Sequence, residues 1–290
     1  MLPTLVIGLR EGLEASLIVG IIAAFLGQQG RRDKLRLVWI GVVAAIVLCL
    51  GIGVGLEALS ANLPQRQQEG METVIGLLAV VLVTYMIVWM AKHARGMKRE
   101  LEGEAAGALA KGSVGALVAM AFLAVLREGF ETTVFLLATL QAASTATLGA
   151  VGAILGILIA VAIGYGIYRG GVRLNLGRFF TATGAVLVFV AAGLVMHALR
   201  TAHEAGWVNF GQQQALDLTA IVRPGTPVEA LLTGVLGIQA VPVVTEAVGW
   251  LIYAVPMLAY VLWPRRKPAR RAAPATEVHR PTPAPAPTES

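Results

Sequence analysis

The sequence predicts an all-α membrane protein that crosses the bilayer seven times. Of its 290 residues, 57% are hydrophobic and only 14% are charged, and the mean hydropathy is +0.74. A soluble domain would carry roughly 25% charged residues. Most of the long apolar runs approach or exceed the ~20 residues that a helix needs to cross the hydrocarbon core. The expected spans are residues 2–26, 37–59, 72–92, 113–140, 147–168, 178–200 and 242–263.

The positions of the basic residues predict how these spans are oriented. Most of the 23 Lys and Arg residues lie in four segments, residues 31–36, 92–111, 169–178 and 265–280. These segments lie after the first, third, fifth and seventh spans, and the positive-inside rule assigns such segments to the cytoplasm. We therefore expect the N-terminus outside the membrane and the C-terminus in the cytoplasm.

A charged pentapeptide occurs twice inside the apolar runs. The copies read R-E-G-L-E at residues 10–14 and R-E-G-F-E at residues 127–131. A charge near the bilayer centre costs at least ~2.5–3.5 kcal/mol on the insertion scale, so these copies indicate a functional site. The first lies in an inward-running span and the second in an outward-running span. Spans one to three and four to six are thus expected to form an inverted repeat, with the site where the halves meet.

The glutamates of the two copies form a predicted metal site. The proposed ligands are Glu11, Glu14, Glu128 and Glu131, and the residues expected to orient them are Arg10 and Arg127. On a helix, the two glutamates of each copy share a face, and the arginine can pair with the second of them. If the two helices meet antiparallel, four carboxylates and two guanidiniums leave a net negative charge. Hard cations, iron among them, suit such oxygen ligands.

Small residues in the spans predict close helix packing. Gly12 and Gly129 lack side chains and would let a partner helix approach the site. Gly12 also belongs to one of two rows that have a small residue at every fourth position, a spacing that brings helix backbones together. The rows are Gly8, Gly12, Ser16 and Gly20 in the first span, and Gly152, Gly156, Ala160 and Gly164 in the fifth.

Several polar residues outside the motif are weaker candidates for an accessory metal site or for the outer mouth of the uptake path. They are Glu246, His197, His203, Glu204 and Asp217. Imidazole and carboxylate groups there could catch a metal, although each residue could equally be an interfacial or solvated group.

The repeated motif is also compatible with roles that involve no iron. The arginines and glutamates could form buried structural pairs, or the carboxylates could relay protons for a solute transporter. Another divalent metal, such as lead or manganese, could replace iron. An enzyme is not expected, because the spans contain no Ser/His pair, HExxH motif or Cys nucleophile. The single cysteine, Cys49, leaves no disulfide framework or thiolate metal site.

With these residues the sequence resembles the oxidase-dependent iron permease family, which includes the fungal high-affinity iron permease and bacterial EfeU-type transporters. The resemblance covers about residues 1–263 and rests on the two R-E-G-x-E copies in a seven-span chain. Supporting matches are His197, residues 204–207, Asp217 and Glu246. One departure is the pair Arg200-Thr201, which stands where bacterial relatives often carry a further His-Glu pair.

The resemblance implies iron import across the cytoplasmic membrane of a bacterium. Iron, ferric or ferrous, would be the transported substrate, with no permanently bound cofactor. The motif glutamates would be the iron ligands. Any oxidation of iron would belong to an outer partner, such as a cupredoxin-like protein, a haem peroxidase or a multicopper oxidase. Membrane lipid is the other expected partner, and nucleic acid is not expected.

The expected domain organisation is one permease domain over residues 1–263, followed by a disordered tail rich in Pro, Ala and Arg over residues 264–290. The parts of the permease domain are repeat A at about 1–92, repeat B at about 113–200, an outer segment at 201–241 and the seventh span at 242–263.

Overall fold

The computed structural model describes residues 1–28, 30, 32–93, 103, 114–142, 146–169, 175–222, 226, 228, 232–233 and 236–262. These residues form seven α-helices and one short 3-10 turn, without a strand. The elements are α1 (Leu2–Gln28), η1 (Arg32–Lys34), α2 (Leu35–Ala61), α3 (Gln65–His93), α5 (Val114–Gln141), α6 (Ala146–Tyr168), α7 (Leu176–Glu204) and α9 (Val244–Leu262). The all-helical prediction is confirmed for this part of the chain.

The observed helices correspond one to one with the predicted spans. The largest difference is at the start of α3, which was expected at residue 72 and begins at Gln65. Its polar first turns carry no apolar signal, but the backbone N–H groups of Gln67 and Gln68 donate to the carbonyl oxygen of Pro64 and start the helix there. The predicted tail, residues 264–290, lies outside the described residues.

Five helices are long and apolar enough to cross a membrane, namely α2, α3, α6, α7 and α9. The other two, α1 and α5, each carry three charges of the repeated motif. Apolar side chains of α2, such as Ile40, Val47, Leu50 and Val54, face outward. Such a continuous exposed apolar surface suits a hydrocarbon environment. The chain is therefore a multi-pass membrane protein.

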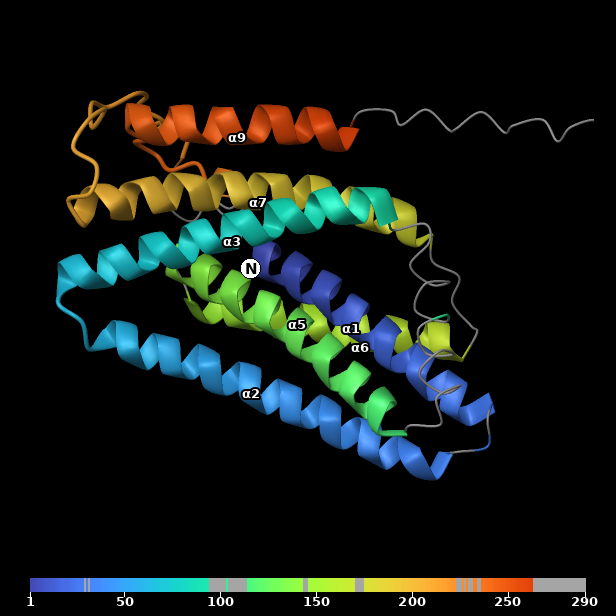
Figure 1. Ribbon diagram of the computed structural model, residues 1–290. Coiled ribbons are helices and arrows are strands. Elements are labelled where there is room, and N and C mark those ends of the chain that lie inside the picture. The colour runs from blue at the N-terminus through green and yellow to red at the C-terminus, as the bar shows by residue number, and fades with distance from the viewer. Residues whose placement is uncertain are drawn as a thin grey trace, which may run out of the picture.

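The two motif helices lie near the centre of the bundle (Figure 1). Helix α1 packs chiefly on α6, and α5 packs chiefly on α2. α1 and α5 also contact each other and run in opposite directions. α3 packs on α7, and α9 covers the other side of α7. Each motif helix thus takes its main support from the opposite half of the chain.

Buried apolar side chains fill the space where α1, α3, α5 and α7 meet. Leu13, Met86, Phe135 and Leu187 belong to one continuous cluster there. A second cluster, which includes Ile22, joins the far end of α1 to α2 and α5. The motif helices are therefore held on several sides.

The contact between α1 and α6 runs along the two predicted rows of small residues. A Cβ added at Gly156 would meet backbone atoms of Leu5 and Leu9, and one added at Gly8 would lie 2.6 Å from the carbonyl oxygen of Ala153. A Cβ at Gly164 would meet Ser16. Close approach of the two helices is observed along the rows, except at Gly20, where a Cβ would have no neighbour within 4 Å.

Replacing Gly156 by Ala should therefore destabilise the protein. The new methyl group would collide with backbone atoms of α1, which cannot rotate away as a side chain can. We expect a loss of about 1–3 kcal/mol, the usual cost of overpacking. Thermal unfolding of the detergent-purified protein, followed by tryptophan fluorescence, measures it. The matched Gly20→Ala variant should unfold at the wild-type temperature or slightly above it, and equal losses in both variants would contradict a packing role for Gly156.

Candidate metal site

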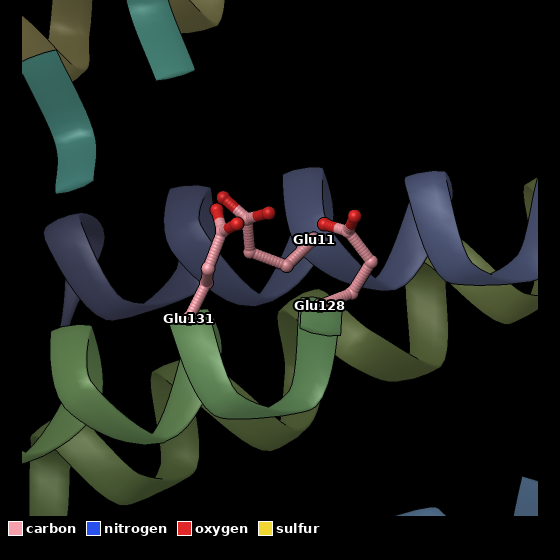
Figure 2. Close-up of side chains that lie close together, drawn as sticks. All are labelled: Glu11, Glu128 and Glu131. Carbon is pink, nitrogen blue, oxygen red and sulfur yellow. The ribbon is translucent and has the colours of Figure 1, made fainter. Parts of the chain in front are cut away.

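The repeated motif brings three carboxylates together between α1 and α5. Carboxylate oxygens of Glu11, Glu128 and Glu131 all lie within 4.8 Å of one another, and all three residues are buried. Figure 2 shows Glu11 from α1 facing Glu128 and Glu131 from α5. The fourth motif glutamate, Glu14, is buried as well, 6% exposed. The structure thus groups acidic side chains from both copies, as the spacing predicted.

Arg10 is enclosed completely. Arg10 is 1% exposed. Its guanidinium lies 5.8 Å from the centre of the Phe180 ring and contacts the sulfur of Met86. Nη1 donates to Glu11 Oε1 over 3.0 Å, while Nη2 lies 3.4 Å from Glu14 Oε1. One cation therefore serves both glutamates of its own motif.

Arg127 has different surroundings. Its side chain is 50% exposed, and its Nε donates to Glu131 Oε1 over 3.1 Å. The same nitrogen lies 3.8 Å from Glu128 Oε1, and the guanidinium stacks 5.7 Å from the centre of the Trp89 ring. The two arginines are equivalent in sequence, but only Arg10 is sealed inside the protein.

Several polar atoms of the site are buried without a hydrogen-bond partner among the described residues. They include Glu11 Oε2, Glu14 Oε1 and Arg10 Nε. Glu14 Oε1 keeps its ion contact with Arg10 Nη2, whereas Glu11 Oε2 has no hydrogen bond to balance its burial, and a bound cation would supply the missing contact. With four carboxylates and two guanidiniums, the arrangement can hold a hard cation.

The motif glycines allow neighbouring helices to pack closely against α1 and α5. A Cβ added at Gly12 would lie 2.9 Å from the Cβ of Ala160 in α6. One added at Gly129 would lie 2.8 Å from the sulfur of Cys49 in α2. The helix that approaches each glycine is thus the second helix of the other half, rather than the other motif helix.

Glu246, predicted as an accessory ligand, is engaged by an arginine. The residue is 1% exposed, and its carboxylate receives hydrogen bonds from Arg200 Nε (2.9 Å) and Nη2 (3.1 Å). A third bond comes from the backbone N–H of Val243, at 3.3 Å. This bidentate pair joins α9 to α7 and occupies the lone pairs that a metal would use.

His197 and Glu204 of α7 face acidic residues of α3. His197 Nε2 lies 3.8 Å from Glu72 Oε2, and this buried nitrogen has no hydrogen-bond partner in the described part of the chain. Glu69 and Glu204 lie close enough for their carboxyl groups to interact electrostatically. These four residues gather at one end of the α3–α7 pair.

His203 and Asp217 lie apart from that group. His203 Nε2 is 3.4 Å from the hydroxyl of Thr245 in α9. Asp217 is exposed and accepts two bonds from Thr219, one from the backbone N–H (3.0 Å) and one from the hydroxyl (2.6 Å). These bonds hold the pKa of the Asp217 carboxyl below its usual value.

Sequence reasoning missed the side chains that surround the motif arginines. Met86, Phe180 and Trp89 come from α3 and α7, far from either motif in the chain, and apolar or aromatic residues in a span carry no signal of their own. The role of Arg200 was missed as well, because its partner Glu246 is distant in sequence.

Almost the whole chain matches one known protein family. The model of the iron permease FTR1 family matches residues 1–265. The chain belongs to the iron permease FTR1 family. Members of this family are permeases, so the chain is a transporter and not an enzyme.

Individual iron permeases of bacteria are similar along nearly their whole length. The chain is 43% identical over 266 residues to the "Ferrous iron permease EfeU" of Escherichia coli O6:H1, covering 91% of this chain and 96% of that protein. It is 44% identical over 263 residues to the "Ferrous iron permease EfeU" of Yersinia pestis, covering 90% of this chain and 93% of that protein. No solved structure matches the chain.

Proposed function

We propose that this protein imports iron across the cytoplasmic membrane of a bacterium, through a site made by the glutamates of the two motifs. The ligands would be Glu11, Glu14, Glu128 and Glu131, with Arg10 and Arg127 as orienting residues. The observation that carries the proposal is the group of three buried carboxylates from opposite helices, within 4.8 Å of one another. The carboxylate oxygens of Glu11 and Glu14 that lack a hydrogen bond support it.

The relatives supply the choice of metal. Both EfeU proteins are named ferrous iron permeases, and we extend that substrate to this chain at 43–44% identity. Carboxylate oxygens alone discriminate weakly among hard divalent cations. Ferrous iron is therefore the first substrate to test, with manganese and lead as the competing metals.

We propose further that residues 1–92 and 113–200 form an inverted repeat. Helix α1 packs on α6 as α5 packs on α2, α1 contacts α7 as α5 contacts α3, and α3 and α7 contact each other. Exchanging the first three helices with the next three leaves this set of contacts unchanged. The opposite directions of α1 and α5 support the same arrangement. Transporters of this kind place their substrate near the middle of the bilayer, between the repeats.

The orientation and the remaining segments follow from the charge pattern. The N-terminus would be periplasmic, and the tail from residue 264 would be cytoplasmic and dispensable for the site. The outer segment 201–241 would then lie on the periplasmic side, with the seventh span at 242–263 returning to the cytoplasm. Any oxidation of iron would be performed on the periplasmic side by a separate cupredoxin-like protein, haem peroxidase or multicopper oxidase.

The proposed outer residues divide into three groups. His197 and Glu204 lie beside Glu72 and Glu69 and could receive a cation on its way to the motif site. Glu246 is already paired with Arg200, which favours a structural role for it. His203 and Asp217 keep the role of possible accessory groups at the outer mouth.

Uptake by the purified protein in lipid vesicles tests the proposal. Vesicles containing an iron-sensitive fluorescent chelator should take up Fe²⁺, kept reduced by ascorbate, in a saturable manner. Parallel assays use Mn²⁺ and Pb²⁺, and a pH-sensitive dye reports proton movement without metal. If the vesicles take up manganese or lead but not iron, that metal rather than iron is the substrate. Proton movement that no metal affects would favour a proton-coupled solute transporter instead.

A further inference from the structure

Each repeated motif is followed, two residues after its second glutamate, by a hydroxyl-bearing side chain. These residues are Ser16 in α1 and Thr133 in α5. The Ser16 hydroxyl is 3.4 Å from the carbonyl oxygen of Ala160, and the Thr133 hydroxyl is 3.5 Å from the carbonyl oxygen of Cys49. Ala160 in α6 and Cys49 in α2 thus receive equivalent contacts.

Ala160 and Cys49 also pack against the motif glycines. Ala160 lies against Gly12, and Cys49 lies against Gly129. In each half, therefore, one small residue of the supporting helix meets the motif glycine through its side chain and the hydroxyl through its carbonyl oxygen. The same hydroxyl-to-carbonyl contact beside a motif glycine thus occurs once in each half of the chain, which general helix packing does not require.

We propose that Ser16 and Thr133 are positioning residues of the metal site. The inference rests on the proposed function and extends the motif to R-E-G-x-E-x-S/T. Each hydroxyl has one proton, which it shares between the carbonyl of the supporting helix and a nearer one in its own helix, Leu13 O for Ser16 (3.1 Å) and Gly129 O for Thr133 (2.8 Å). It thereby links the backbone of the motif helix directly to the helix that supports it.

This link affects the distances between the carboxylates, because the carboxylates belong to two different helix pairs, α1 with α6 and α5 with α2. Glu11 is carried by α1 on α6, whereas Glu128 and Glu131 are carried by α5 on α2. The separation of their oxygens therefore depends on the register of each pair. In a membrane, lipid is as apolar as the helix surfaces, so close packing and interhelical hydrogen bonds set that register. A binding site whose supporting contacts are loosened loses affinity before it loses its fold.

Two isosteric substitutions test the proposal, Ser16→Ala and Thr133→Val. In Fe²⁺ uptake by proteoliposomes, each should raise KM roughly threefold to tenfold, the range expected for an interhelical hydrogen bond in a membrane. The maximal rate per folded protein should change less than KM, and the double variant should show about the product of the two effects. Ser16→Thr and Thr133→Ser retain a hydroxyl and should keep the wild-type KM.

Thr132→Val is the matched control. The Thr132 hydroxyl donates to Glu128 O of its own helix (2.7 Å), as Thr133 does to Gly129 O, and no bond from it to a second helix is present among the described residues. If Thr132→Val raises KM as much as Thr133→Val does, or if the hydroxyl-free variants keep the wild-type KM, the positioning role is wrong.

The wild-type protein and Glu128→Gln are measured in the same vesicles to separate this inference from the proposed function. Iron uptake that depends on Glu128 but not on the two hydroxyls would overturn the positioning role alone. Failure of the wild-type protein to take up iron would overturn the proposed function and the positioning role with it. A rise in KM that is reversed by Ser16→Thr and Thr133→Ser supports both.

Discussion

Replacing Glu128 by Gln should abolish iron uptake. The substitution keeps the size of the side chain and removes one of the three carboxylates that approach within 4.8 Å. Loss of a residue that only supports a metal ligand costs about 10–100-fold, so loss of a ligand should reduce uptake by at least about 100-fold. Initial rates of Fe²⁺ uptake in proteoliposomes measure it, with the same result expected for Glu11→Gln and Glu131→Gln.

The control for this experiment is Glu57→Gln. Glu57 is an exposed glutamate near the end of α2 and has no place in the motif site. It should retain the wild-type rate, which would exclude a general effect of losing one negative charge. Full uptake by Glu128→Gln and Glu131→Gln, in protein shown to be folded, would contradict the assignment of these residues as ligands.

Arg10→Ala should destabilise the protein far more than Arg127→Ala, although the two residues occupy the same position of the motif. Removing Arg10 leaves Glu11 and Glu14 buried without their cation, and breaking a buried ion pair costs about 3–5 kcal/mol. The side chain of Arg127 is 50% exposed, so its loss should cost about 1 kcal/mol or less.

Thermal unfolding of the two variants in the same detergent makes the comparison. Arg10→Ala should unfold well below the wild-type temperature or fail to accumulate in the membrane, while Arg127→Ala should accumulate normally. Equal stability of the two variants would contradict the difference in burial. Loss of folding in Arg10→Ala, together with full uptake by the glutamate variants, would instead indicate that the motif is purely structural.

Much of the fold could be predicted from the sequence because the bilayer imposes length and composition on each span. The seven helices follow from the apolar runs, and the rows containing Gly156 and Gly164 indicate close packing without identifying the partner helix. The grouping of Glu11 with Glu128 and Glu131 follows from their spacing and from the opposite directions of the two spans.

What could not be predicted depends on contacts between distant segments. The difference between Arg10 and Arg127 arises from side chains of α3 and α7, and identical pentapeptide positions carry no information about it. The pairing of Glu246 with Arg200 likewise requires the packing of α9 on α7. The contacts of the Ser16 and Thr133 hydroxyls with Ala160 and Cys49 likewise depend on the packing of α1 on α6 and of α5 on α2.

The packing of each motif helix on the opposite half has a consequence for how the protein is made. Helix α1 enters the membrane first, yet its principal neighbour, α6, is translated only after α2, α3 and α5. The three charged groups of the first motif must therefore remain in the bilayer without their final surroundings while these three helices are synthesised. Completion of the carboxylate cluster is a late event in biogenesis, and a chain truncated before residue 146 would contain both pentapeptides without the helix that supports the first of them.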